Sequence, residues 1–155
     1  MPKRSAALLV YRRGGEDGLE VLIGHMGGPF WARKQARAWS IPKGEYDGAE
    51  APLAAARREF EEEIGSAAPS GPVADLGELR QPGGKVIVTY AVEGDLDLSG
   101  LRSNTFTMEW PRGSEQVREY PELDRAEWMS LGRAAEMLVK GQVPILGALR
   151  AHLRV

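Results

Sequence analysis

The chain has 155 residues, of which 43% are hydrophobic and 27% charged, and this length and composition predict one soluble globular domain over residues 1–155. A formal net charge of −2 gives no overall attraction to nucleic acid or to anionic membranes, so nucleic acid is not an expected partner. The absence of cysteine excludes disulfides, thiol nucleophiles and cysteine-ligated zinc or iron–sulfur centres.

The N-terminal segment MPKRSAALLVYRR has a basic start and then an apolar run of only about six residues. That run is too short for a secretory signal or a membrane span, and no other stretch approaches the roughly 18 apolar residues of a membrane helix. The sequence therefore predicts a cytoplasmic protein without a membrane partner.

Two β-prone runs at residues 5–12 and 19–25 are separated by the polar turn GGEDG, which predicts neighbouring strands. Residues 26–43 follow with no acid and four basic residues, namely Arg33, Lys34, Arg37 and Lys43. A basic segment beside an acidic one suits a polyphosphate, although a solvated loop is the alternative for the first three. Trp39 and Trp31 are candidates to stack on a nucleobase or, alternatively, to pack in the interior.

Residues 51–64 are rich in Ala, Leu, Arg and Glu, contain proline only near their start and stop at Gly65, which predicts an α-helix. Helical spacing places apolar residues on one stripe and three carboxylates on the arc beside it. The stripe contains Leu53, Ala56, Phe60 and Ile64, and the arc contains Glu59, Glu62 and Glu63. A buried stripe would thus hold a cluster of carboxylates in place.

These carboxylates repel one another, and the single guanidinium of Arg58, which can reach Glu61 or Glu62, cannot neutralise all of them. A hard divalent cation can, because Mg²⁺ prefers oxygen ligands and is often shared between carboxylates and substrate phosphates. The arc therefore predicts an Mg²⁺ site, with Mn²⁺ as a possible substitute. A solvated helix face is the alternative.

Further strands are predicted at residues 73–81, 85–92, 105–110 and 124–131, with a PGG turn at 82–84 and helices at 132–140 and 144–154. Residues 111–121 are polar and contain glycine, which predicts a loop long enough to reach an active site. Strands before and after a central helix, with helices at the end, indicate an α/β layered domain.

Within residues 44–66, the spacing G-x5-E-x7-R-E-x2-E-E-x-G resembles the Nudix box of the Nudix hydrolase family. The fixed positions are Gly44, Glu50, Arg58, Glu59, Glu62, Glu63 and Gly65. The family usually has an aliphatic residue where this chain has Phe60 and another where it has Ser66. The resemblance implies an α/β/α sandwich in which a mixed β-sheet lies between helices.

The resemblance also implies hydrolysis of a pyrophosphate linkage in a nucleoside diphosphate joined to another group. Glu59, Glu62 and Glu63 are then the expected metal ligands, and the main chain of Lys43 is expected to join them. Arg58 would orient a neighbouring carboxylate. Gly44 would permit the loop before the helix, and Gly65 would cap the helix end. Glu50 would fix that loop or contact the metal through water, unless it only suits the helix start.

The sequence is compatible with alternatives for the general base, the substrate and the class of function. The general base is either Glu59 or an acid on a distant segment, with Glu109 and Glu115 as candidates. The segment WSIPKGE before the box is similar to that of hydrolases of dinucleoside polyphosphates, while nucleoside triphosphates and nucleotide sugars remain alternatives. Other hypotheses are a Nudix-fold module that binds nucleotides without hydrolysing them, and an RNA 5′-end hydrolase, which only the basic segment supports.

Overall fold

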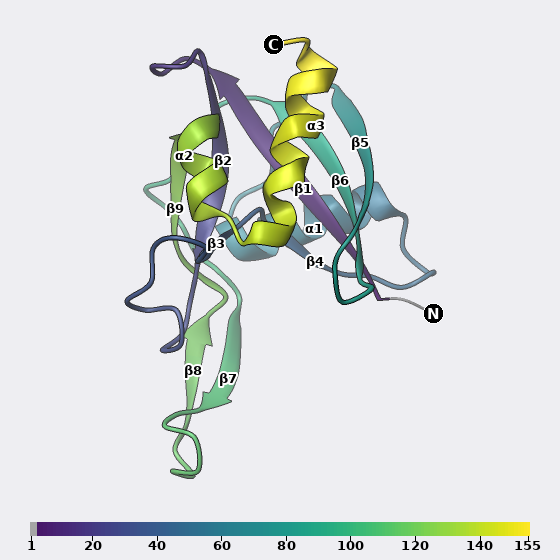
Figure 1. Ribbon diagram of the computed structural model, residues 1–155. Helices are drawn as coiled ribbons and strands as arrows, with labels where there is room; N and C mark the ends of the chain where they lie inside the picture. The colour runs from purple at the N-terminus through teal and green to yellow at the C-terminus, as the bar shows by residue number, and fades with distance from the viewer. Residues whose placement is uncertain (1–2) are drawn as a thin grey trace.

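The computed structural model describes residues 3–155, which form a seven-stranded sheet, a separate two-stranded hairpin and three α-helices (Figure 1). The strands are β1 (Arg4–Arg13), β2 (Leu19–Met26), β3 (Trp39–Ser40), β4 (Lys43–Glu45), β5 (Val73–Arg80), β6 (Val86–Glu93), β7 (Thr105–Glu109), β8 (Val117–Pro121) and β9 (Leu123–Ser130). The helices are α1 (Pro52–Ile64), α2 (Leu131–Met137) and α3 (Val143–Leu153), and a 3₁₀ turn, η1 (Lys140–Gln142), precedes α3.

The main sheet is mixed and has β1 near its centre. Its strand order is β3-β2-β1-β6-β5, with β4 paired to β1 and β9 paired to β2. The β1–β6 pair is parallel, and the other pairs are antiparallel. The two expected hairpins, β1–β2 and β5–β6, are both present, whereas the short strands β3 and β4 were not predicted from the sequence.

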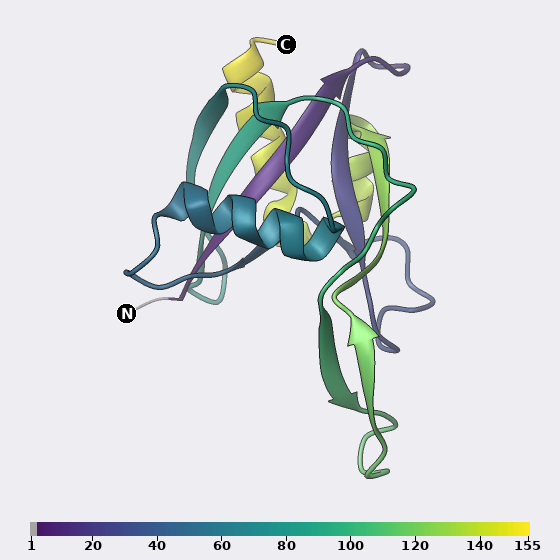
Figure 2. The ribbon, with the colours of Figure 1, turned by 180° about the vertical axis from the view of Figure 1, so that it is seen from behind.

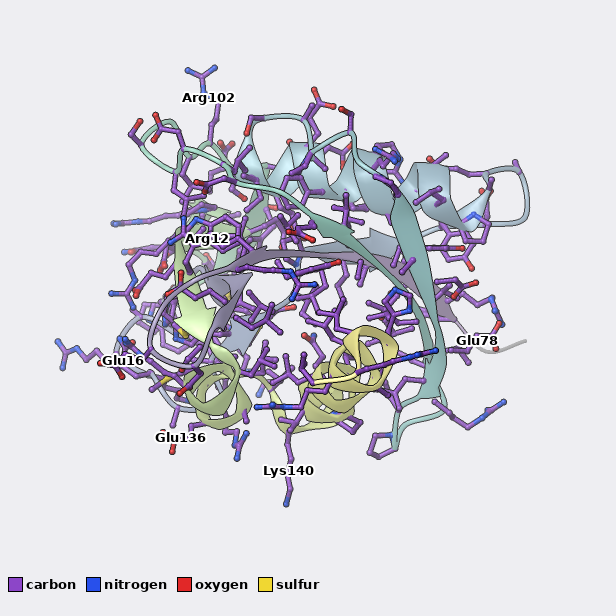
Figure 3. The ribbon with its side chains drawn as sticks, turned by 90° about the horizontal axis from the view of Figure 1, so that it is seen from above. Arg12, Glu16, Glu78, Arg102, Glu136 and Lys140 are labelled. Atoms are coloured by element: carbon purple, nitrogen blue, oxygen red, sulfur yellow. The ribbon has the colours of Figure 1, made fainter. Side chains whose placement is uncertain are left out.

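Alternate side chains of β1 enter two cores, one on each face of the sheet. Ala7 and Leu9 pack with side chains of α2 and α3, whereas Leu8 and Val10 pack with those of α1. Figure 3 shows the sheet between α1 on one side and α2 with α3 on the other. The expected α/β/α sandwich with a mixed sheet is therefore confirmed.

Helix α1 has the boundaries that its sequence predicts. It begins at Pro52, whose fixed φ suits the first helical turn, and it ends before Gly65, which has φ 90° and donates its N–H to the carbonyl of Glu61 at 2.8 Å. Its buried side chains are Ala55, Ala56, Phe60 and Ile64, while Leu53 is only half-buried. None of the helices in residues 3–155 has the length and apolar character to cross a bilayer.

The strand predicted at residues 105–110 is present as β7, but residues 117–121 form a second strand where a loop was expected. Strands β7 and β8 pair with each other, from Thr105 opposite Pro121 to Glu109 opposite Val117, and the hairpin projects from the body (Figures 1 and 2). The prediction of a loop at residues 111–121 that reaches an active site is therefore wrong. β8 escaped prediction because its sequence VREYP is mostly exposed and has no apolar alternation.

Candidate active site

The acidic face of α1 is organised around the guanidinium of Arg58. This group donates two hydrogen bonds of 2.9 Å to the two carboxylate oxygens of Glu50. The same contact holds the pKa of Glu50 below its ordinary value. Nη1 of Arg58 also donates to Glu59 at 2.9 Å and to Glu62 at 3.2 Å. Arg58 therefore connects the segment before the helix to two of the three glutamates of the arc.

Gly44 lies in β4 directly against the carboxyl group of Glu59. A Cβ atom at position 44 would overlap that carboxyl group, and the Glu59 side chain is only 16% exposed. Gly44 is thus needed for close packing of the strand against Glu59, and not for freedom of the loop before the helix as expected. Burial raises the pKa of Glu59, and hydrogen bonding from Arg58 opposes the shift.

Glu63 has the most strongly shifted pKa among the carboxyl groups of this face. Burial raises the pKa of Glu63 to about 8, and the negative charges of Glu59 and Glu122 add to the shift. The charge and backbone amide of Lys43 act in the opposite direction. Glu63 is thus influenced by groups of β4 and of the β8–β9 junction.

Glu122, at this junction, is an acid that the sequence reading missed. Its N–H donates to the Asn104 carbonyl at 2.8 Å, and its own carbonyl accepts from the N–H of Gly27 at 2.9 Å. The N–H of Asn104 donates in turn to the Glu62 carbonyl at 2.7 Å. These bonds hold the base of the hairpin and the start of the basic segment against the end of α1. No sequence pattern separates Glu122 from the neighbouring acids, so only the fold identifies it.

The charge balance of this face fits a divalent cation. The carboxyl groups of Glu50, Glu59 and Glu62 share one guanidinium, and the charge of Glu63 adds to theirs beside Glu59. Their oxygens are ligands that Mg²⁺ and Mn²⁺ prefer. Among residues 3–155, no three acidic or histidine groups converge closely enough to hold an ion by themselves. Arg58 already engages oxygens of Glu59 and Glu62, so a bound ion would compete with it for them.

The raised pKa of Glu63 predicts that the metal-free protein loses stability as the pH rises. The pKa of Glu63 is about 8 in the folded state, against an ordinary value of 4.5 in the unfolded chain. The bound proton therefore stabilises the fold fully below about pH 4.5, and this stabilisation is lost as the pH rises through about 8. We expect Tm in the presence of a chelator to fall by several degrees between about pH 6 and about pH 9. The Glu63→Gln variant is expected to lose most of this dependence, and an unchanged slope in that variant would contradict the assignment.

A pocket of about 350 Å³ lies on the other face of β4. Lys43 pairs with Ala7 in the β1–β4 register, so its side chain faces the same side of the sheet as Ala7, toward the α2–α3 core. The pocket is lined in part by Met26, Trp31, Lys43, Gln81, Lys85 and Gln142. It therefore combines an aromatic and an apolar side chain with two cations. Lys85, at the start of the β6 region, was also missed from the sequence.

The predicted substrate residues of the basic segment lie in different surroundings, and they do not form one site. Arg33 and Lys34 are exposed, and Lys34 Nζ lies 3.6 Å from the centre of the Phe30 ring. Arg37 instead donates to the carbonyls of Ala135 and Leu138 at the end of α2. Trp39 is fully buried in the core, so the structure contradicts its proposed role as a stacking surface. Trp31 is the tryptophan that faces the pocket.

Comparisons with known proteins agree with the fold. A family model described as the NUDIX domain matches residues 1–149. The chain belongs to the Nudix family. The resemblance found in residues 44–66 is thereby confirmed for almost the whole chain. No curated protein matches the sequence significantly.

Three solved structures illustrate the likeness of this Nudix chain. The NUDIX domain of Shewanella oneidensis NrtR in complex with ADP ribose is 15% identical, with a TM-score of 0.68 over 99% of this chain and 89% of that chain. A C. elegans Ap4A hydrolase in a binary complex is 19% identical, with a TM-score of 0.61 over 97% and 98% of the two chains. A MutT protein from Methanosarcina mazei Go1 is 17% identical, with a TM-score of 0.61 over 99% and 97%. At these identities the likeness establishes the shared fold.

Membership supports nucleotide-linked pyrophosphate hydrolysis in general and a small-molecule nucleotide ligand. Nudix hydrolases generally use divalent metals such as Mg²⁺, which matches the oxygen-rich face of α1.

Proposed function

We propose that this protein is a metal-dependent hydrolase that cleaves a pyrophosphate linkage in a nucleoside diphosphate joined to another group. Nucleoside triphosphates and dinucleoside polyphosphates are the favoured substrates. The observation that carries the proposal is the half-buried acidic face of α1, where Arg58 orients Glu50, Glu59 and Glu62 beside a strongly perturbed Glu63. Perturbed carboxyl groups gathered beside a pocket are typical of catalytic sites.

The metal-binding groups in this proposal are the carboxylates of Glu59, Glu62 and Glu63 and the main-chain carbonyl of Lys43. When bound there, Mg²⁺ or Mn²⁺ neutralises charge on the phosphates and lowers the pKa of the attacking water. Glu59 and Glu62 are positioned by Arg58, and Glu59 is confined by Gly44. Gly65 ends the helix so that Glu62 and Glu63 lie in its last turn.

Glu122 is our candidate for the general base, which accepts a proton from the attacking water. Its negative charge adds to the rise in the pKa of Glu63, and its backbone is bonded to Asn104, which in turn bonds the Glu62 carbonyl, so it lies near the acidic face of α1. Glu109 and Glu115 are less suitable, because Glu109 accepts from the N–H of Gly113 at 2.7 Å and Glu115 belongs to the tip of the projecting hairpin. Glu59, the other candidate from the sequence, is enclosed by Arg58 and β4.

The pocket beyond β4 is our candidate site for the nucleotide. Lys43 and Lys85 would neutralise phosphate oxygens, and Trp31 would contact the base. A single strand separates this pocket from Glu63, because Lys43 lines the pocket with its side chain and borders Glu63 with its backbone. Arg33 and Lys34 lie outside the pocket lining and would contribute only to the electrostatic field around its entrance.

Loss of the Lys85 charge is expected to weaken substrate binding without slowing the chemical step. For Lys85→Met we predict a KM about tenfold higher and an unchanged kcat, since the lost contact stabilises ground state and transition state equally. Lys140→Met is the matched control, because Lys140 extends into solvent from η1 (Figure 3). Equal KM values for the two variants would show that Lys85 does not contact the substrate.

The proposal is tested by measuring Mg²⁺-dependent product release from nucleoside triphosphates, dinucleoside polyphosphates, ADP-ribose and nucleotide sugars. Turnover of at least one class that requires the metal would support the hydrolase and define its substrate class. Nucleotide binding without turnover of any compound would instead favour a binding module. The NrtR domain in complex with ADP ribose makes that alternative worth including. A steep salt dependence of RNA binding would favour an RNA substrate, which we do not expect.

A further inference from the structure

His25 lies in β2 on the inner side of the basic segment and makes two side-chain hydrogen bonds. Its side chain is 1% exposed. Nδ1 lies 2.8 Å from a carboxylate oxygen of Asp124 in β9, and Nε2 lies 2.7 Å from the carbonyl oxygen of Lys34. The ring also packs against the edge of Trp39, with ring centres 5.2 Å apart. A buried histidine with two specific partners links β2, β9 and the basic segment at one point.

Both partners of His25 are hydrogen-bond acceptors, so each bond forms only when the ring nitrogen facing it carries a proton. The bond to Lys34 therefore depends on an N–H at Nε2, whereas the bond to Asp124 depends on one at Nδ1. The same carboxylate of Asp124 also lies 4.0 Å from Nε of Arg125. Arg125 also donates to the side chain of Gln35 at 3.1 Å. The Lys34–Gln35 region is thus attached to the sheet through side chains.

The Lys34 carbonyl belongs to a turn that sets the position of Trp31. The N–H of Lys34 donates to the Trp31 carbonyl at 2.9 Å, and Trp31 together with Met26 lines the proposed nucleotide pocket. Two successive hydrogen bonds therefore connect the His25 ring to the backbone of Trp31. Between residues 27 and 38 of the described chain, the other backbone–backbone bonds to neighbouring elements are at the two ends, at Gly27 and Ala38.

We propose that His25 is a positioning residue for the substrate. Its Nε2–H bond to Lys34 fixes the turn that holds Trp31 at the pocket. The effect on substrate rests on the proposed function, whereas the effect on the turn does not. The proposal assigns different roles to the two ring nitrogens, because only the bond from Nε2 is made to the turn, whereas Nδ1 bonds Asp124.

The test compares His25→Gln with His25→Asn. The amide nitrogen of glutamine takes a place similar to that of Nε2 and can donate to Lys34, whereas that of asparagine is similar to Nδ1 and can donate only to Asp124. Each variant buries one amide, so each is the control for the other. We expect His25→Gln to keep a KM near that of the wild type and His25→Asn to raise KM on the order of five- to tenfold at unchanged kcat, as for one lost hydrogen bond.

A second measurement does not need activity. Amide hydrogen exchange at Lys34 is expected to be faster in His25→Asn than in His25→Gln, because that N–H is bonded within the turn. Equal exchange at Lys34, or equal KM values for the two variants, would overturn the role of His25. If the wild type hydrolyses no substrate, the proposed function fails, and the exchange contrast alone then decides whether His25 holds the turn.

Discussion

Replacing both Glu62 and Glu63 with glutamine is expected to abolish hydrolysis while leaving the protein folded. The variant keeps the shape and burial of both side chains but removes two of the negative charges that would hold the metal. We expect kcat to fall by at least about a thousandfold, which corresponds to about 4 kcal/mol of lost transition-state stabilisation. The measurement is the Mg²⁺-dependent release of product from the best substrate of the panel.

Two comparisons make this result specific. Glu61→Gln removes a carboxylate from the same turn of α1, but Glu61 is exposed and makes no side-chain bond to Arg58 among residues 3–155. We expect that variant to retain full activity. We also expect the Glu62, Glu63 double variant to have a higher Tm than the wild type in chelator at about pH 9, because Glu63 is ionised there in the wild type and the variant lacks that buried charge. Full turnover in the folded double variant would exclude the acidic face as the catalytic site.

Local sequence patterns were sufficient for the helix and its acidic face. Pro52 and Gly65 mark the ends of α1 through backbone geometry alone, and the 3.6-residue period places the glutamates on one arc. The strands of the β1–β2 and β5–β6 hairpins follow from β-branched runs and short turns for the same reason. These features depend on residues close together in the chain, so a single sequence contains the information for them.

Features that depend on distant residues could not be predicted in this way. Gly44 has its role because the β1–β4 register brings it against Glu59, and Trp39 is in the core because β3 pairs with β2. Arg37 is polar and looks available to a ligand, yet it is used by the end of α2. In each case the partner is an element far away in sequence, and the residue type alone is compatible with either role.

Glu122 also owes its position to elements distant in sequence, and its replacement is expected to cause a large loss of activity. We expect Glu122→Gln to lower kcat by about a hundred- to ten-thousandfold, the range typical for loss of a general base. Its backbone bonds to Asn104 and Gly27 do not involve the carboxylate, so the variant is expected to fold normally. Because hydroxide from solvent can replace a missing base, the residual rate is expected to increase with pH more steeply than the wild-type rate. The measurement is a pH–rate profile of kcat for both proteins.

Glu109→Gln and Glu115→Gln are the matched controls, since both residues lie on the same hairpin-forming segment as Glu122. Glu109 binds the turn at Gly113, and Glu115 lies in that turn with φ 63°, so neither faces Glu63. We expect both variants to keep the wild-type kcat. A large loss in either of them, together with normal activity in Glu122→Gln, would mean that the hairpin folds back over α1 during catalysis. The general base would then be Glu109 or Glu115 at the end of the hairpin, and the assignment of Glu122 would be wrong.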